Sequence, residues 1–319
     1  MAKLAIIGHT GFVGGALVHQ QDFDGKFNRK NIETIGQNAF HTVVCAAAPG
    51  SMFIANRSPE SDFTAINMLI DQLKKVRTQR FVLISSIAVL ADFASGADEY
   101  TQSFQQDLAY GRNRRALEAF CEAHFRDCLI VRLPALFGHG LKKNFIFDLL
   151  NPVPSMLTET RLQALLDNVD PVFQGVLTHF YTLDRTTGLS HLNRAMLNAY
   201  SQRPSLDAAV RESGLSAVQF HHPASTFQFY DIARLWHDVE TAAKADLRRI
   251  HLAVEPLRAT DVHGRLLGTD MPDSGARQHH EDMRTRYAKN WGGEGPYLED
   301  AATLLDKLSK FFNDKRNGS

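Results

Sequence analysis

Three glycines near the start of the chain have the spacing of a diphosphate-binding turn. Gly8, Gly11 and Gly14 follow the apolar run 3–7 and precede the helix-like run 15–20. In a dinucleotide fold, such glycines permit the tight turn, the approach of the backbone to the pyrophosphate and the close packing of helix on strand. Free amides and the helix dipole favour a negative charge there. The strand-to-helix context therefore favours cofactor binding over a merely structural turn.

Further cofactor candidates lie where later strands end. A short strand at 26–28 leads to Asn28 and Arg29, and a basic residue at this place suits the extra phosphate of NADP, whereas NAD usually meets an acid. A solvated basic loop is the other interpretation. A strand at 42–48 ends in alanines, which leave room for a ligand or for close helix packing. The cofactor-binding candidates are Gly8, Thr10, Gly11, Phe12, Val13, Gly14, Asn28, Arg29, Ala46, Ala47, Ala48 and Pro134, with NADP slightly preferred over NAD.

A second group of candidates combines hydroxyl groups with a cation. The apolar run 80–90 is typical of a buried strand and contains Ser85 and Ser86. A helical run from Asp107 carries Tyr110 and Arg114, which are four residues apart and so share one face. Each also has a structural interpretation: a serine that caps the backbone, a core aromatic ring, or a surface arginine near Glu118.

The spacing of the elements predicts an α/β fold, a Rossmann-type doubly wound parallel sheet with a reduced strand count. Only about a dozen residues separate Arg29 from the next strand, too few for a helix, a strand and another helix. A short helix at 31–35 is expected in their place. The further expected elements are a helix at 60–76 with Phe63, Ile66, Leu69, Ile70 and Leu73 in its core face, a strand at 128–133, and helices at 231–244 and 301–312.

Two domains are expected. Residues 1–140 form the dinucleotide-binding domain, to which the chain returns around 216–253, and residues 141–319 form mainly a smaller mixed or helical substrate lobe with the C-terminal helix. Residues 151–215 indicate helices, including 162–166 and 189–200, without a recognisable motif. Residues 268–297 are rich in Gly, Pro, Asp and His and are expected to be loop-like.

Composition excludes several classes of function. Lys plus Arg equals Asp plus Glu, 35 each among 319 residues, which argues against nucleic-acid binding. No apolar run reaches the ~18 residues of a membrane span, and no signal peptide is visible. Three cysteines without Cys-x-x-Cys pairing fit a cytoplasmic protein. The pairs at 221–222 and 279–280 are adjacent histidines without other ligands at metal-binding spacing, so no metal site is expected.

Several of these motifs occur together in one known family. The three glycines, the run Ser85-Ser86-Ile-Ala-Val, Tyr110 with a basic residue four later, and the run Arg-Leu-Pro-Ala-Leu-Phe-Gly at 132–138 resemble the extended short-chain dehydrogenase/reductases. Their closest branch is the NAD-dependent epimerase/dehydratase group, which acts mainly on nucleotide sugars. The resemblance covers roughly the first 145 residues. It implies a homodimer formed through the Tyr110 helix and the helix before it.

The resemblance also implies roles for individual residues. Ser86 matches the catalytic hydroxyl residue and Tyr110 the catalytic tyrosine, while Arg114 replaces the family's lysine. In the family an asparagine near this point contacts the diphosphate of the substrate; Asn144 is the candidate for that role, with Lys143 nearby to meet the negative charge. A charged helix end exposed to water is the other interpretation of these residues. The expected activity is an NAD(P)-dependent oxidation and reduction of a nucleotide-linked sugar, by an oxidoreductase, epimerase or dehydratase.

The replacement of lysine by Arg114 leaves more than one outcome open. A free tyrosine has a pKa near ~10 and needs a nearby positive charge to act as a base at neutral pH. Arginine supplies that charge permanently, but as a planar fork of different reach. We expect Arg114 to keep the phenol of Tyr110 acidic while Ser86 holds the reacting oxygen. The alternatives are a catalytically decayed NAD(P)-binding regulatory or assembly protein, and a scaffold that binds no nucleotide.

Overall fold

The computed structural model describes residues 3–318, and the chain forms two compact units. Unit 1 consists of the chain up to Leu141 together with Phe227–Leu257 and His280–Lys307. Unit 2 consists of Lys142–Thr226, Arg258–His279 and the described residues from Leu308 onward. Within residues 3–318, no helix is long and apolar enough to span a membrane.

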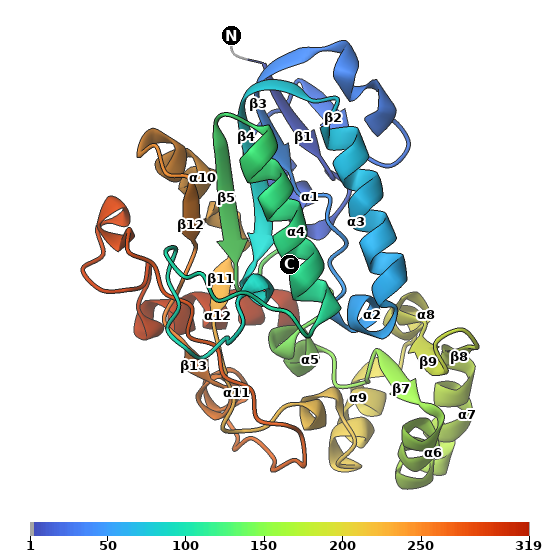
Figure 1. Cartoon of the computed structure of the whole chain (residues 1–319). Helices are drawn as coiled ribbons and strands as arrows, with labels where there is room; N and C mark the ends of the chain where they lie inside the picture. The colour runs from blue at the N-terminus through green and yellow to red at the C-terminus, as the bar shows by residue number, and fades with distance from the viewer. Residues whose placement is uncertain (1–2, 319) are drawn as a thin grey trace. The chain divides into compact units, whose positions relative to one another are not determined.

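Unit 1 is built on a six-stranded parallel sheet in the order β12-β5-β4-β3-β1-β2. Helices α3 and α4 cover one face and α1 and α10 cover the other, which gives three layers (Figure 1). The predicted Rossmann-type α/β fold is therefore confirmed. The elements are β1 (Leu4–Ile7), α1 (Phe12–Gln20), β2 (Gly25–Phe27), β3 (Ala39–Cys45), α3 (Pro59–Leu73), β4 (Arg77–Ser86), α4 (Ala109–His124), β5 (Cys128–Leu133), α10 (Leu235–Lys244) and β12 (Arg249–His251).

The connection between β2 and β3 is short, as the sequence predicts. It contains one 3₁₀ helix, η1 (Ile32–Gln37), and β3 then pairs directly with β1. Strand β3 ends at Cys45, so the three alanines at 46–48 lie just beyond the strand and not within it. These residues therefore belong to the loop at the carboxyl edge of the sheet, where such sheets bind ligands.

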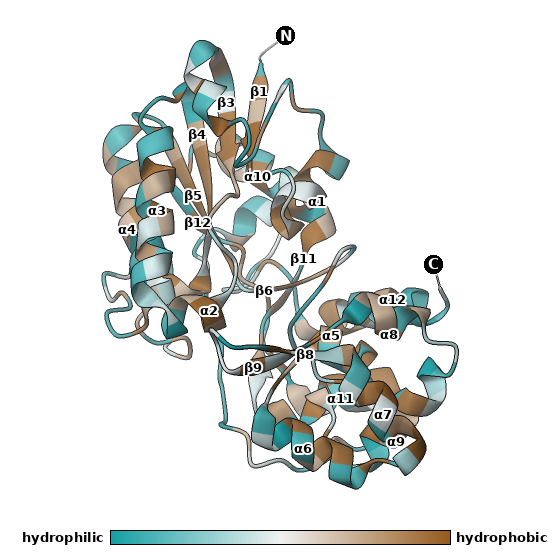
Figure 2. Ribbon diagram, turned by 90° about the vertical axis from the view of Figure 1, so that its right-hand side faces the viewer, coloured by the Kyte–Doolittle hydropathy of each residue, from teal (hydrophilic) through white to brown (hydrophobic). Residues whose placement is uncertain are grey.

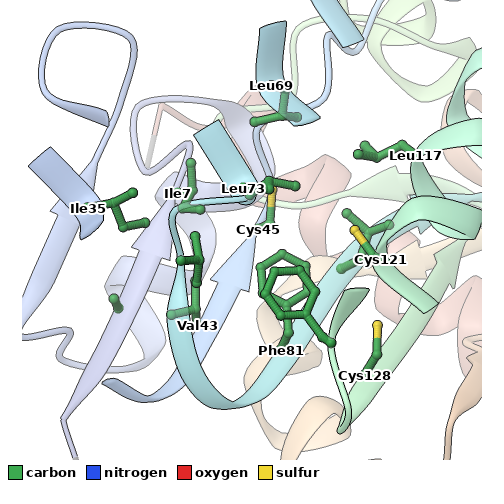
Figure 3. Close-up of a cluster of buried hydrophobic side chains, with 14 of the residues drawn as sticks. Ile7, Ile35, Val43, Cys45, Leu69, Leu73, Phe81, Leu117, Cys121 and Cys128 are labelled. Atoms are coloured by element: carbon green, nitrogen blue, oxygen red, sulfur yellow. The ribbon is translucent and has the colours of Figure 1, made fainter. Parts of the chain in front are cut away.

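The main apolar core of unit 1 lies between the sheet and helices α3 and α4. Figure 3 shows Cys45, Cys121 and Cys128 in this cluster, beside Phe81. The ring of Phe81 stacks on that of Phe125, with centroids 3.9 Å apart. Burial raises the pKa of Cys45 and of Cys128 to about 12. These side chains therefore remain thiols at neutral pH and contribute apolar packing.

The core face of α3 differs from the predicted one at a single position. Ile66, Leu69 and Leu73 are buried as expected, but Phe63 is 44% exposed and Asp62 is buried beside it. Asp62 takes a place on the buried face of α3, because its carboxylate is paired with a buried arginine of α4. The assignment of Phe63 to the core is therefore wrong.

Figure 2 shows that apolar residues are concentrated on the central strands of the sheet. Residues 268–297 are irregular apart from one 3₁₀ helix, as predicted.

Shorter elements complete unit 1. The remaining elements are α2 (Met52–Arg57), η2 (Ile87–Val89), the parallel pair β6 (Ala135–Phe137) and β11 (Phe229–Asp231), η4 (Ile232–Arg234) and η5 (Ala288–Trp291). The chain passes from one unit to the other within three further elements, β10 (Thr226–Phe227), β13 (Leu257–Arg258) and α12 (Ala301–Arg316), and also after Leu141 and after His279.

Unit 2 is mixed and not wholly helical. Strands β7, β9 and β8 form an antiparallel sheet, with β9 in the middle. The predicted helix at 189–200 is wrong in its first half, because residues 189–192 pair with strands on both sides and only the following residues form a helix. The elements are α5 (Phe145–Leu150), β7 (Met156–Thr158), α6 (Glu159–Asn168), α7 (Pro171–Phe180), β8 (Tyr181–Asp184), β9 (Leu189–Leu192), α8 (Arg194–Ala199), α9 (Arg203–Glu212), η3 (Ala217–Phe220) and α11 (Ala259–Leu267).

Candidate active site

The glycine turn between β1 and α1 leaves no room for side chains at two of its three glycines. Gly8 has φ +92°, and a Cβ there would lie 2.6 Å from the carbonyl oxygen of Ala46. A Cβ on Gly14 would lie 2.1 Å from the carbonyl oxygen of Gly8. Gly11 differs, because it is exposed and its Cβ would make only an ordinary 3.4 Å contact. Packing therefore requires Gly8 and Gly14, whereas Gly11 keeps the start of α1 open.

The start of α1 has the features of an anion site. Gly11 is the N-cap residue and supplies no side-chain hydrogen bond to the first turn, which contains Phe12 and Val13. Thr10 beside it is exposed. Backbone amides at an uncapped helix start can bind a phosphate, and the helix dipole favours its charge. These residues fit the diphosphate of a dinucleotide.

The turn is also tied to the end of β2. The amide of Gly8 and the Nδ1 of His9 both hydrogen-bond the carbonyl oxygen of Phe27, at 2.8 and 3.0 Å. Asn28 shapes the next turn, since its Oδ1 accepts from the amide of Lys30 at 2.9 Å. Arg29 is exposed at this edge. Sequence reasoning missed His9, although its place between the first two glycines marks it as part of the turn.

The proposed catalytic hydroxyl groups meet at the carboxyl edge of the same sheet. Ser86 ends β4, Tyr110 lies in the first turn of α4, and the hydroxyl of Ser86 lies close enough to the phenol to lower its pKa. Ser86 also caps η2, because its Oγ accepts from the amide of Ala88 at 3.2 Å. In a parallel sheet the glycine turn, which follows β1, lies on this same edge. The structure thus brings Ser86 and Tyr110 together.

Two residues that the sequence did not single out fix Tyr110 in this place. A Cβ on Gly111 would lie 1.9 Å from the carbonyl oxygen of Ala88, so α4 rests directly on η2. The amide of Tyr110 donates to Oδ1 of Asn56 at 2.9 Å, which joins the start of α4 to α2. Gly111 could have been suspected, because a glycine inside a helix costs stability and often marks a close approach.

Arg114 is buried and its charge is compensated. Its side chain is 3% exposed and forms a two-pronged ion pair with Asp62 of α3, with Nη2 2.9 Å from Oδ1. It also donates to the carbonyl oxygen of Pro49, in the loop after β3. Its Cζ lies 3.9 Å from the ring centroid of Tyr110. Arg114 is therefore not a surface arginine: it connects Tyr110 with α3 and the loop after β3.

The pKa of Tyr110 lies above its ordinary value. Burial of the phenol is the largest cause, and the charge of Asp62 acts in the same direction. The charge of Arg114 and the nearby hydroxyl of Ser86 both lower this pKa but do not outweigh burial. Arg114 thus acts in the expected direction without making the phenol acidic. The tyrosine side chain remains protonated at neutral pH.

A fully buried polar network supports the site from behind. Oγ of Ser85 donates to Oε1 of Glu118 at 2.6 Å, and Arg132 binds both oxygens of Glu118, at 2.9 and 2.7 Å. Arg132 also donates to Nε2 of His251 at 3.1 Å, and the Nδ1 of that ring donates to the carbonyl oxygen of Arg284 at 2.9 Å. The network joins β4, β5, β12 and α4. Glu118 therefore pairs with Arg132 and not with Arg114.

The other predicted site residues are distributed over both units. Pro134 is buried between β5 and β6, and the alanines at 46–48 are half-buried beside Gly8. Lys143 and Asn144 belong to unit 2. Asn144 has φ 115°, a strained conformation for a residue with a side chain. Its Oδ1 accepts from the amide of Phe147 at 3.1 Å and so caps α5.

Two further features lie away from the predicted catalytic and cofactor residues. A groove of ≈ 370 Å³ in unit 1 is lined by Glu99, Tyr100, Arg248 and Tyr287 among others, and by none of those residues. In unit 2, Nε2 of His221 lies 2.8 Å from Oδ2 of Asp148. Among residues 3–318, no three His, Cys, Asp or Glu side chains are grouped in a way that could hold a metal ion.

Of the comparisons with known proteins, the one with solved structures supports the fold. No protein-family model matches the sequence, and a search of curated proteins gives no significant match. Similar solved structures include dTDP-4-dehydrorhamnose reductase from Bacillus anthracis str. Ames in complex with NADP, at 13% identity and a TM-score of 0.61, with 98% of each chain covered. A UDP-galactose 4-epimerase has 13% identity and a TM-score of 0.62, with 99% of each chain covered.

A third similar structure is the UDP-N-acetylglucosamine 4-epimerase from Methanobrevibacter ruminantium M1, in complex with UDP-N-acetylmuramic acid. It has 12% identity and a TM-score of 0.62, and the likeness covers 100% of this chain and 99% of that one. At such identities the likeness concerns the fold alone. The solved structures share the fold over nearly the whole length of this chain, and in this respect they agree with the resemblance found in the first 145 residues.

Proposed function

We propose that this protein is an NAD(P)-dependent enzyme that oxidises or reduces a nucleotide-linked sugar, with Tyr110 and Ser86 at the reacting oxygen. The observation that carries the proposal is that the hydroxyl of Ser86 and the phenol of Tyr110 lie together at the same sheet edge as the open glycine turn. A phosphate-binding turn alone would fit many nucleotide-binding proteins. The adjacent phenol and hydroxyl add the means to bind and protonate a carbonyl oxygen.

The residues of the glycine turn would hold the cofactor. The amides at Phe12 and Val13 would bind its diphosphate, with Gly11 leaving space for the approach. Arg29 would contact the extra phosphate of NADP at the end of β2. When bound, the nicotinamide would supply or accept a hydride. Ser86 would hold the reacting oxygen by a hydrogen bond, and Tyr110 would exchange the proton with it.

The substrate class is taken from the fold neighbours. They include a dTDP-sugar reductase and two UDP-sugar 4-epimerases, so a nucleoside diphosphate linked to a sugar is the substrate that we propose. Lys143 and Asn144 of unit 2 are proposed to contact its diphosphate. Lys143 is exposed, and the strained backbone of Asn144 is a feature often found at ligand sites.

A homodimer through α3 and α4 is also proposed. Phe63 and Met68 on the outer side of α3 are 44% and 66% exposed. Exposed large apolar side chains are a common mark of a protein interface. Light scattering of the wild type and of the double variant Phe63→Lys, Met68→Lys tests this. The wild type is expected to be a dimer and the variant a monomer.

The experiment that tests the function combines binding with turnover. NADPH and NADH are titrated into the purified protein, and dTDP-4-dehydrorhamnose, UDP-galactose and UDP-N-acetylglucosamine are then offered as substrates. Binding with turnover that Tyr110→Phe abolishes supports the proposal. Binding without turnover of any nucleotide sugar favours the catalytically decayed regulatory protein, and an absence of binding refutes both.

A further inference from the structure

The buried carboxylate of Asp62 is a charge that the proposed chemistry has not yet used. It lies on the core face of α3, 5% exposed, in line with Ile66, Leu69 and Leu73. A buried charge is costly unless it is paired and hydrogen-bonded. Asp62 meets both conditions, because it binds Arg114 through both oxygens and accepts from Nδ2 of Asn113 at 2.9 Å.

The pair determines how Arg114 can act on Tyr110. The guanidinium lies over the face of the phenol ring, 3.9 Å from its centroid. Its Nη atoms donate to Asp62 and to the carbonyl oxygen of Pro49, and Nη1 also lies 3.3 Å from the carbonyl oxygen of Tyr110. Its Nε is buried without a hydrogen-bond partner. The shorter hydrogen bonds are thus those to α3 and to the loop after β3, and the carboxylate of Asp62 balances the positive charge within the same cluster.

We propose, on the basis of the function proposed above, that Asp62 is a positioning residue that keeps Tyr110 a proton donor, so that the site is built for reduction of a carbonyl. The groups that face the phenol are Arg114 of α4, Asp62 of α3 and the hydroxyl of Ser86 on β4. A free cation beside a phenol stabilises the phenolate, which is the base that oxidation of an alcohol requires. A cation neutralised by a carboxylate does so far less.

The reaction balances in the direction of reduction. The O–H bond of Tyr110 breaks and its proton moves to the carbonyl oxygen of the sugar, while the carbonyl carbon receives a hydride from a reduced pyridine nucleotide. The carbonyl becomes a secondary alcohol and the nucleotide is oxidised. Tyr110 then regains its proton from solvent. A 4-epimerase would first need to remove a proton from a hydroxyl group, for which the neutral phenol is the wrong form.

The test follows the ionisation of Tyr110 directly in the nucleotide-free protein. Tyrosine labelled with ¹³C at Cζ is incorporated, the signal of Tyr110 is assigned with Tyr110→Phe, and its shift is followed against pH. In the wild type the midpoint is expected above ~10, the ordinary value of tyrosine. In Asp62→Asn it should fall by roughly one unit, because Arg114 then acts without compensation. Asp71→Asn, the same change at an exposed position of α3, should leave it unchanged.

A second variant covers the case in which Asp62→Asn does not fold. The double variant Asp62→Asn, Arg114→Gln removes both charges, and its midpoint should remain above ~10 as in the wild type. A wild-type midpoint below ~9, or an unchanged midpoint in folded Asp62→Asn, would overturn the proposal. So would a double variant that titrates well below the wild type.

Failure of the proposed function would be recognised separately. A protein that does not bind NADPH or NADH refutes the function whatever the titration shows, whereas a protein that binds and turns over but has an acidic Tyr110 refutes only the role of Asp62. Once a substrate is known, kcat/KM for reduction should be constant from about pH 6 to about pH 9 and should decline at higher pH. In Asp62→Asn the decline of kcat/KM should begin roughly one pH unit lower, as for the titration of Tyr110.

Discussion

The contact between α4 and η2 predicts that Gly111→Ala separates the two proposed catalytic groups. The added Cβ would lie 1.9 Å from the carbonyl oxygen of Ala88, and side-chain atoms of Gln105 are 2.8 Å and 2.9 Å from the same point. An ordinary contact at about 3.4 Å requires a movement of about 1.5 Å. The atom that is met belongs to the backbone, so the start of α4 must move and not a side chain.

This movement should affect catalysis more than stability. A displacement near 1.5 Å moves the phenol of Tyr110 away from the hydroxyl of Ser86, and misplacement by about 1 Å can cost about 10²-fold in rate. Overpacking costs about 1–3 kcal/mol, of which the helix preference of alanine over glycine restores about 1 kcal/mol. We therefore expect a loss of about 100-fold in kcat/KM with an unfolding free energy lowered by no more than about 2 kcal/mol.

The assay pairs turnover with urea unfolding and NADPH titration. Gly175→Ala is the matched control, because this glycine lies within α7 and a Cβ there would meet nothing within 4 Å. The control should keep full activity, and its unfolding free energy should rise by up to about 1 kcal/mol. NADPH affinity of Gly111→Ala should be close to that of the wild type, since the glycine turn is untouched. A folded Gly111→Ala protein with turnover within twofold of the wild type would refute the reasoning.

Three other predictions follow from the same part of the structure. Tyr110→Phe should lower turnover by at least about 10²-fold while NADPH affinity stays within about threefold, which stopped-flow kinetics and calorimetry measure; equal losses in both would contradict it. Arg132→Met should lower the unfolding free energy in urea by about 3 kcal/mol, because the buried Glu118 would lose its two-pronged partner and keep only the partly exposed Arg115; a loss below about 1 kcal/mol would speak against the buried pair. The pKa of His251 is lowered to about 3, mainly by burial and by the charge of Arg132. The contribution of the neutral His251 to the free energy of unfolding is therefore complete above about pH 6.5 and is lost as the pH falls toward 3. The wild type should lose about 1.4 kcal/mol per pH unit in that window beyond what His251→Gln loses, and parallel stability curves for the two proteins would contradict this.

The sequence predicts the elements that rest on local patterns. The glycine turn, the shortened connection after β2 and the strand 128–133 depend on spacing along the chain, and the structure has all three. Tyr110 and Ser86 could be named because the residues around them resemble the motifs of a known family. Both lie at the carboxyl edge of the parallel sheet, Ser86 at the end of β4 and Tyr110 at the start of α4.

The residues that sequence reasoning missed act across long separations. Asp62 and Arg114 are 52 positions apart, and Asn56 and Tyr110 are 54 apart. Their pairing follows from the packing of α3 and α2 against α4, which no local pattern contains. One signal was present, because Asp62 lies on the same stripe of α3 as Ile66 and Leu69. A buried acid on an apolar stripe needs a cation as its partner, and in this structure that cation is Arg114.

The measurement that tests the account most directly is a calorimetric titration of NADPH into the wild type and into Gly11→Ala. A Cβ at Gly11 makes only an ordinary contact with Gly8, so the variant should unfold like the wild type. The account predicts that the wild type binds with a Kd below about 1 mM and that the variant binds at least tenfold more weakly, because its methyl group occupies the place of the diphosphate. Equal affinity in the two proteins, or no saturable binding of NADPH or NADH by the wild type, would contradict it.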